Sequence, residues 1–289
     1  MKKGIFKKRI NRSIGGNLAI FVCLALLGAT LALPLVYIVN AAFKPMDELF
    51  IFPPSIFVKH PTTDNFIKLG QITASSWVPL SRYIFNSVFV STLATVGHLL
   101  FASMAAYPLA KHDFVGKKVL NGIVRLALLF TPAVTAIPLY LVMSSLHLIN
   151  TYASLILPSI ASTLGLYLMQ NFMVNIPDSM LEAARLDGAG EFSIYARVVM
   201  PNVKPAAITM VIFAFNAIWN SNGGAFVYEE KLKVLPAALS QITSGGTGDA
   251  VARAGVAAAV LLILMIPPMI IFLFTQNKVI ETMTTSGMK

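Results

Sequence analysis

Uncharged apolar runs recur six times along the chain, and short polar passages separate them. Each run reaches or exceeds the length of about 20 residues that a helix needs to cross the hydrocarbon core of a bilayer. Backbone amides in lipid must be paired within their own segment, which favours helices, and barrel strands would be about half as long with alternating polarity. The pattern therefore predicts an all-α membrane protein with six transmembrane helices, over residues 17–43, 83–110, 126–146, 152–174, 206–228 and 254–277.

Lysine and arginine residues between these runs predict the orientation, because cytoplasmic loops carry an excess of both. Fourteen of them lie in the N-terminus, the second-to-third connection, the fourth-to-fifth connection and the C-terminus. Seven lie in the other connections, and Arg125 lies near a boundary. We therefore expect a basic cytoplasmic N-terminus (1–16), a transmembrane domain (17–277) and a cytoplasmic C-terminal tail (278–289).

One charged, glycine-broken passage lies between the fourth and fifth runs, at residues 178–201. Pro177 ends the preceding helix, and Ser179 with Glu182 has the spacing of a capping box that starts a new one. Gly188 then interrupts this helix. The passage is expected on the cytoplasmic side.

The second half of the passage is predicted to be a further short amphipathic helix. It places Phe192, Tyr195 and Val199 on one side before Pro201 ends it. The outcome is a helix, a bend and another helix beneath the bilayer. An element with one apolar and one acidic face is suited to docking into another protein.

The composition agrees with an integral membrane protein. Hydrophobic residues make up 56% of the chain and charged residues 12%, with a mean hydropathy of +0.75. The net charge of +10 is explained by basic loops beside membrane spans, so no nucleic-acid partner is expected. Cys23 is the one cysteine, so disulfides contribute nothing to the fold.

No residue constellation indicates catalysis, a metal or a bound cofactor. The phosphate-binding pattern G-x-x-x-x-G-K-[ST] is missing from the sequence, so ATP is not expected to bind this chain by that route. Four histidines are scattered without metal-ligand spacing, and no Ser, His and acid trio converges. His98, in the middle of a run, is expected to be packed or hydrogen-bonded rather than to line a path.

The passage at 178–201 resembles the cytoplasmic signature of the permease subunits of binding-protein-dependent ATP-binding-cassette (ABC) importers. That signature reads Glu-Ala-Ala, three residues, Gly, nine residues, Ile, one residue, Leu-Pro. Val and Met replace Ile and Leu conservatively in this chain. The matching positions are Glu182, Ala183, Ala184, Gly188, Val198, Met200 and Pro201.

Further matches resemble the carbohydrate-importing branch, the relatives of the second maltose-transporter permease. They extend from roughly the second run to the C-terminus. These matches are Pro132, Pro138, residues 148–158, Gly165, Trp219, Asn220 and residues 285–289.

The resemblance implies that the passage couples the spans to a cytoplasmic ATPase. Glu182 would be the charged contact, Ala183 and Ala184 would allow close approach, and Asp187 with Gly188 would form the bend. The competing interpretation is that Glu182 only caps its own helix and that the alanines reflect helix propensity.

The resemblance also implies the partners and the location. They are a second permease subunit, two ATPases that use ATP and Mg, an extracellular solute-binding protein and a sugar, in a bacterial or archaeal inner membrane. This chain itself would bind no cofactor. The alternative is an ATP-independent secondary transporter or channel, but such proteins more often carry acids within their spans, and all six runs lack Asp and Glu.

Polar side chains inside the runs are candidates for the solute path. Trp219 could stack on a sugar ring, while hydrogen bonding between helices explains the polar groups equally well. Arg125 is expected to snorkel to the inner interface. The path candidates are Gln170, Asn171, Asn216, Trp219 and Asn220.

Three other features have competing explanations. Pro132 and Pro138 are expected to give a functional kink in the third run. The tail, with Ser286, Gly287 and Met288, is expected either to contact the ATPases or to be disordered. The glycine-rich loop at 244–248 either enters the binding protein or is a flexible linker.

Overall fold

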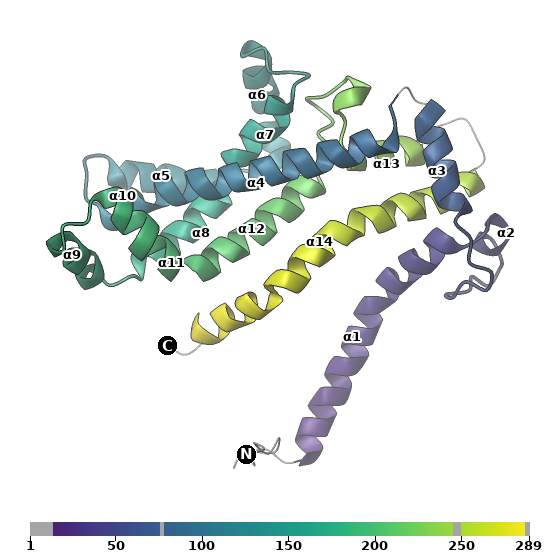
Figure 1. Ribbon diagram of the computed structural model, residues 1–289, viewed down its shortest axis with the longest axis horizontal. Coiled ribbons are helices and arrows are strands. Elements are labelled where there is room, and N and C mark those ends of the chain that lie inside the picture. Colours follow the sequence, from purple (N-terminus) through teal and green to yellow (C-terminus); the bar gives the residue numbers. More distant parts are fainter. Residues whose placement is uncertain (1–13, 76–77, 245–249, 287–289) are drawn as a thin grey trace.

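A computed structural model of the protein describes residues 14–75, 78–244 and 250–286. Within these ranges the chain consists of helices and loops, with no strand. Helices α4, α12 and α14 run along the long axis of the bundle, with α9 and α10 at one end and α3 and α13 at the other (Figure 1). We call these the α9 end and the α13 end.

The helices in chain order are α1 (Ile14–Phe43), α2 (Met46–Leu49), α3 (Asp64–Ser75), α4 (Leu80–Lys111), α5 (Lys117–Ala127), α6 (Pro132–Ser145), α7 (Tyr152–Ile160), α8 (Thr163–Val174), α9 (Asp178–Leu186), α10 (Glu191–Ile194), the π-helix η1 (Tyr195–Val199), α11 (Met200–Asn202), α12 (Lys204–Trp219), the 3-10 helix η2 (Glu230–Leu232), α13 (Leu235–Ser244) and α14 (Ala250–Ser286).

Each predicted run corresponds to helix, and the number of spans depends on two bends. Four segments are long and apolar enough to cross alone: Gly15–Phe43, Leu80–Lys111, Tyr152–Val174 and Arg253–Gln276. Two bent helix pairs add a fifth and a sixth span if each pair crosses once. They are α5 with α6, bent by 113°, and Glu191–Asn202 with Lys204–Trp219, bent by 79°.

The third run is not the single helix predicted over residues 126–146. Helix α5 ends at Ala127 and α6 begins at Pro132, so a bend in the third run, as expected from Pro132, lies just ahead of that residue. Thr131 is extended, with φ −80° and ψ 152°, because the ring of a following proline disfavours helical backbone. Pro138, in contrast, lies inside α6 without breaking it.

The fifth run is shorter than predicted, because α12 ends at Trp219. Residues 220–228, which were expected to continue the span, form a loop instead. Gly223 has a φ of +61°, a conformation that side chains with a Cβ rarely adopt. The amide oxygen of Asn150 holds this loop by accepting hydrogen bonds from the backbone N–H groups of Tyr228 and Glu229, each at 2.9 Å.

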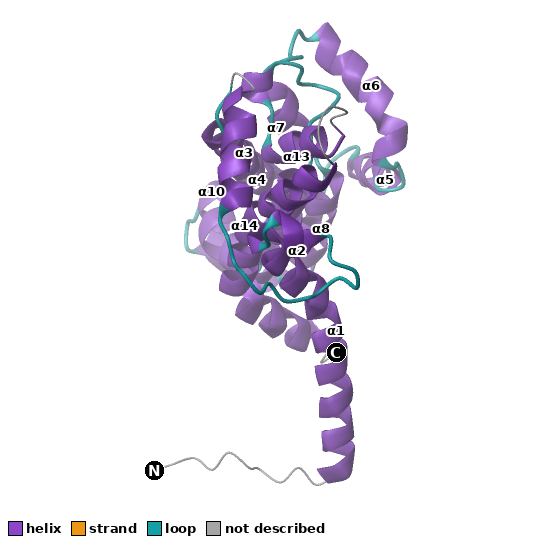
Figure 2. Ribbon diagram, turned by 90° about the vertical axis from the view of Figure 1, so that its right-hand side faces the viewer, coloured by secondary structure: helices purple, strands orange, loops and turns teal. Residues whose placement is uncertain are grey.

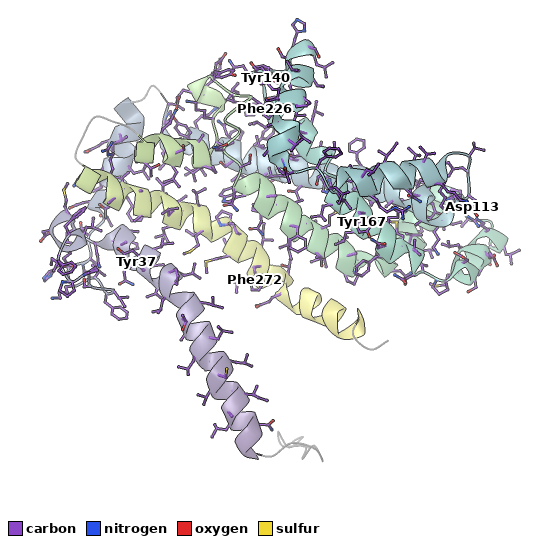
Figure 3. The ribbon with its side chains drawn as sticks, turned by 180° about the vertical axis from the view of Figure 1, so that it is seen from behind. Tyr37, Asp113, Tyr140, Tyr167, Phe226 and Phe272 are labelled. Atoms are coloured by element: carbon purple, nitrogen blue, oxygen red, sulfur yellow. The ribbon has the colours of Figure 1, made fainter. Side chains whose placement is uncertain are left out.

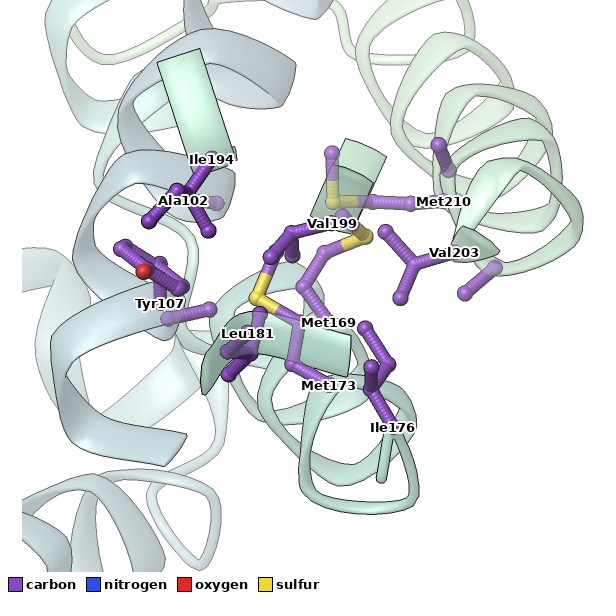
Figure 4. Close-up of a cluster of buried hydrophobic side chains, with 13 residues drawn as sticks. Ala102, Tyr107, Met169, Met173, Ile176, Leu181, Ile194, Val199, Val203 and Met210 are labelled. Carbon is purple, nitrogen blue, oxygen red and sulfur yellow. The ribbon is translucent and has the colours of Figure 1, made fainter. Parts of the chain in front are cut away.

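Of the four apolar clusters in the described residues, two make up most of the core. One lies at the α13 end and joins α3, α4, α12, α13 and α14. The other lies at the α9 end and joins α4, α8, α9, η1 and α12, with Leu181, Met173 and Val199 fully enclosed (Figure 4). The polar passage of the sequence is therefore packed against three of the spans.

Helices α1 and α6 lie largely outside this core (Figure 2). The most apolar part of α1 buries none of its residues, and only its last turn, with Ala41 and Ala42, packs against α14. Met143 is the buried residue of α6. The ring of Tyr140, in the second half of α6, stacks on that of Phe226 with ring centroids 6.5 Å apart (Figure 3). Helices apolar on all sides and left uncovered in this way suit lipid or a second membrane subunit.

Helices α4 and α8 approach closely where a glycine faces a histidine. His98 is 1% exposed, and its Nδ1 lies 2.9 Å from the carbonyl oxygen of Ile160. A Cβ built on Gly165 would lie 2.0 Å from Nε2 of His98 and 2.7 Å from Sδ of Met210. His98 is thus packed and hydrogen-bonded, as expected, and Gly165 makes room for it.

We predict that Gly165→Ala lowers stability by about 1–3 kcal/mol, because the added methyl group must displace His98 from its hydrogen bond. The measurement is thermal unfolding of the purified protein in detergent. Gly28→Ala is the control, since a Cβ on Gly28 meets nothing within 4 Å. Equal melting temperatures for the two variants would contradict this account of the α4–α8 contact.

Candidate functional site

The polar passage begins with α9, whose end is shaped by Gly188. The N–H of Gly188 donates to the carbonyl of Arg185, and the N–H of Ala189 donates to the carbonyl of Ala184, each at 3.0 Å. This pair of bonds is a Schellman motif, in which the residue after the C-cap is left-handed. Gly188 has a φ of +79°. The bend therefore needs a glycine for its backbone, with Asp187 as the C-cap.

The signature residues of α9 lie on both sides of it. Leu181 is buried in the core, and Ala184 packs partly against the same cluster. Glu182 and Ala183 are exposed. The predicted capping box is not formed, because α9 begins at Asp178 with Pro177 at the N-cap and no side-chain cap bond. Among the described residues, Glu182 has no ion pair or hydrogen bond from its side chain.

The second half of the passage runs on through Pro201, which was expected to end it. The N–H of Met200 donates to the carbonyl of Tyr195, five residues back, which makes a π turn. A proline in an α-helix clashes with the carbonyl four residues earlier, and the wider turn lies where that clash would occur. The helix ends only after Asn202.

One face of this second half is buried as predicted, except at its start. Val199 is 0% exposed, and the hydroxyl of Tyr195 lies 2.7 Å from Oγ of Ser103 on α4. Phe192, however, is 74% exposed. Its ring centroid lies 6.1 Å from that of Tyr195, and Phe192 is not part of the buried cluster.

Lys111, the last residue of α4, ties the passage to the end of α8. Its Nζ donates to the carbonyl of Val174 at 3.2 Å, to the carbonyl of Ile176 and to Oδ1 of Asp178 at 2.8 Å. These carbonyls belong to the end of a helix, where backbone acceptors lack partners. The hydrogen bond from Lys111 lowers the pKa of Asp178. The stability that this bond adds to the folded state is therefore complete above the ordinary pKa of 3.8 and is lost as the pH falls below that value.

Glu191 is a second attachment point between the passage and α4. Its carboxylate accepts from the hydroxyl of Tyr107 at 2.7 Å and from Nε of Arg185 at 3.0 Å, and it lies 3.3 Å from Nε2 of His112. Glu191 therefore links α9, α10 and α4. Sequence reasoning missed Glu191, Tyr107 and Lys111, because no local spacing shows that residues 84 positions apart meet.

The residues expected along the solute path lie in two separate places. Gln170 and Asn171 line a crevice between α5 and α8, whereas the other three, Asn216, Trp219 and Asn220, lie in α12 or at its end. Each of the three asparagines Asn171, Asn216 and Asn220 donates its amide to the carbonyl four residues back in its own helix, at 3.0, 2.9 and 2.8 Å. Trp219 is 2% exposed, and its Nε1 donates to the carbonyl of Leu264 at 2.9 Å. It stacks on Phe215 in the core and does not present its ring to a sugar.

Two expectations fall partly or wholly outside the described residues. Helix α14 continues as far as Ser286, and Gly287 and Met288 lie beyond it. In the predicted glycine-rich loop, Ser244 is the last residue of α13, and residues 245–248 lie outside the described part.

Comparison with known proteins decides the family. Residues 98–281, more than half of the chain, match the family described as "binding-protein-dependent transport system inner membrane component". The chain belongs to this family. It is the permease subunit of an ABC importer, a multi-pass inner membrane protein rather than an enzyme.

Two relatives match along most of their length. The permease is 29% identical over 265 residues to the "Arabinooligosaccharides transport system permease protein AraQ" of Halalkalibacterium halodurans, covering 89% of this chain and 90% of that protein. It is 31% identical over 280 residues to the "Probable ABC transporter permease protein YurM" of Bacillus subtilis, covering 95% and 89%.

Two solved structures share the fold. A chain of a bacterial ABC transporter involved in the import of the acidic polysaccharide alginate has a TM-score of 0.78 at 20% identity, covering 93% of the permease and 99% of that chain. A second, from the alginate transporter in complex with an alginate pentasaccharide-bound periplasmic protein, has a TM-score of 0.57 at 16% identity, with 89% and 93% covered.

We predict that Gly188→Ala lowers the free energy of local unfolding of the bend by about 1–2 kcal/mol, because the left-handed conformation is that much less favourable for alanine than for glycine. The backbone amides of α9 in the purified permease should therefore exchange their hydrogens faster. Gly190→Ala is the matched control in the same bend, since its φ of −71° suits any residue and a Cβ there meets nothing within 4 Å. If both variants exchanged like the wild type, the glycine would not be needed for the bend.

Proposed function

We propose that the permease forms half of a translocation path and that the passage at 178–201, the coupling loop, receives force from a cytoplasmic ATPase. One observation carries this proposal: α9 exposes Glu182 and Ala183 while its opposite face is buried against the spans. The same passage also carries exposed apolar side chains, with Leu186 at 89% and Phe192 at 74% exposure. Exposed apolar side chains on an otherwise polar loop indicate a surface that binds another protein.

The attachments of the coupling loop support a mechanical role. Leu181 packs with residues of α4, α8 and α12, and Lys111 and Glu191 add polar links to the same α4. A displacement of α9 would therefore move several spans together instead of deforming a flexible loop, because close-packed interfaces transmit strain. Glu182 would meet a basic group on the ATPase, with Ala183, Ala184, Asp187, Gly188 and Pro201 keeping the shape of the docking element.

The distribution of charge supports a cytoplasmic location for the α9 end. Lys111, Lys117, Arg185, Arg197 and Lys204 belong to the elements gathered there, at the end where Asp113 lies (Figure 3). The C-terminal end of α14 would then be cytoplasmic, because α14 runs from the α13 end back to the α9 end. The start of α1 would be cytoplasmic too, because the last turn of α1 packs against the first part of α14, at the α13 end. The tail residues Ser286, Gly287 and Met288 would lie within reach of the ATPases.

We propose a sugar or oligosaccharide as the solute. AraQ is named for arabinooligosaccharides, and the structural neighbour imports alginate. The neighbouring complex with a periplasmic protein supports a solute-binding protein as the partner that delivers the solute. A second permease subunit would complete the path, two ATPases would use ATP and Mg, and Asn171, Asn216 and Asn220 could offer amide groups along the way.

We predict that Glu182→Lys reduces ATPase binding at least roughly tenfold, because a charge contact at the centre of an interface would become a repulsion. Co-purification of the ATPase and solute uptake in vesicles would both fall. The melting temperature of the permease should not change, since Glu182 is exposed and has no side-chain partner among the described residues.

Asp64→Lys is the control, an exposed acid in the first turn of α3 at the opposite end. It should leave ATPase binding intact. Full ATPase binding by the Glu182→Lys variant would reject the proposed role of α9.

A further inference from the structure

Helix α5 is strongly amphipathic, and its polar side faces the protein. Four apolar residues are 45% to 66% exposed on the side away from α8: Val119, Leu120, Ile123 and Leu126. On the other side, Oδ1 of Asn121 accepts a hydrogen bond from Nε2 of Gln170 on α8, at 2.9 Å. A helix beside a soluble core shows the opposite arrangement. This arrangement is expected for a helix whose exposed face meets an apolar environment and whose other face, toward α8, borders a polar space.

That space is a crevice of about 190 Å³ between α5 and α8. No carboxylate is among its lining residues, which are Asn121, Arg125, Tyr167, Gln170, Asn171 and Val174. The α8 side belongs to the candidate span Tyr152–Val174. Polar groups in a span that face a cavity rather than lipid mark solute pathways.

Arg125 gives the crevice a positive charge that the described residues do not neutralise. Its Nε donates to the carbonyl of Asn121, one turn back, at 3.1 Å. No ion pair in the described part of the chain includes Arg125, so its two terminal nitrogens are available. A guanidinium group pairs with a carboxylate through two parallel hydrogen bonds.

We propose that the crevice is a station on the solute path that binds a carboxylate group, with Arg125 pairing the carboxylate. The amides of Asn121, Gln170 and Asn171 and the hydroxyl of Tyr167 would bind neighbouring sugar hydroxyls. The solute class is thus an oligosaccharide containing uronate units. This inference rests on the proposed transport function and names the chemistry of its solute.

The first test measures the charge of the crevice without requiring transport. Asn171→Cys is introduced in a Cys23→Ser background of the assembled transporter. Its labelling rate is then measured with an anionic and a cationic methanethiosulfonate reagent, normalised to Val115→Cys, which is fully exposed. Adding Arg125→Gln should lower the anionic rate roughly fivefold and raise the cationic rate by about the same factor, as expected for one unit charge about 4 Å away in water.

Lys118→Gln is the matched control, because it removes the same charge from the same helix but does not line the crevice. It should change the ratio less than about twofold, given screening over the longer distance. The proposal would be overturned if the reagents did not label the Asn171→Cys variant, or if Arg125→Gln left the anionic-to-cationic ratio unchanged. Neither result would bear on ATPase docking, which the Glu182 variant tests separately.

The second test concerns the ligand. Trigalacturonate should slow labelling of the Asn171→Cys variant, whereas its neutral methyl ester should not. Equal protection by both, or by neither, would overturn the assignment to uronates. A lipid phosphate could also pair with Arg125, so labelling is repeated in nanodiscs with and without phosphatidylglycerol. If that lipid lowers the ratio as much as Arg125→Gln does, Arg125 is a headgroup anchor and the proposal is wrong.

Discussion

The burial of Leu181 is the contact on which the rest of the arrangement depends. A polar loop beneath a membrane would ordinarily move freely, because few apolar contacts hold such a segment. Here one face of α9 belongs to the apolar cluster that also packs α4, α8 and α12 together. The buried face gives the loop its fixed position, and that position leaves the signature residues Glu182 and Ala183 on the surface.

The polar contacts around this cluster refine the geometry rather than create it. Lys111 satisfies carbonyls at the end of α8, and Glu191 gathers a tyrosine and a histidine from the end of α4 and an arginine from α9. Exposed ion pairs of this kind contribute little stability individually. Their value here is directional, since they fix how the short helices are oriented on α4. The glycine bend adds the turn that these links require.

The sequence was sufficient for features that depend on local or periodic signals. Six apolar runs, the helix–bend–helix passage and the need for Gly188 all follow from length, periodicity and backbone preference. The family assignment also followed from the spacing of the signature. In contrast, the early end of α12 and the burial of Trp219 depend on which surfaces meet in three dimensions. A tryptophan beside an asparagine reads the same in sequence whether it faces a core or a cavity.

The loose attachment of α1 has a consequence for where the chain tolerates substitution. Only its last turn packs against the remainder, and the stretch that matches the family model begins at residue 98, well after it. The matched stretch contains residues 178–201 and all the residues that pack around Leu181, including those of the second half of α4. Substitutions on the uncovered surface of α1 are therefore expected to disturb the packing of this chain less than substitutions among the helices that surround Leu181, because surface changes away from packed contacts rarely alter stability.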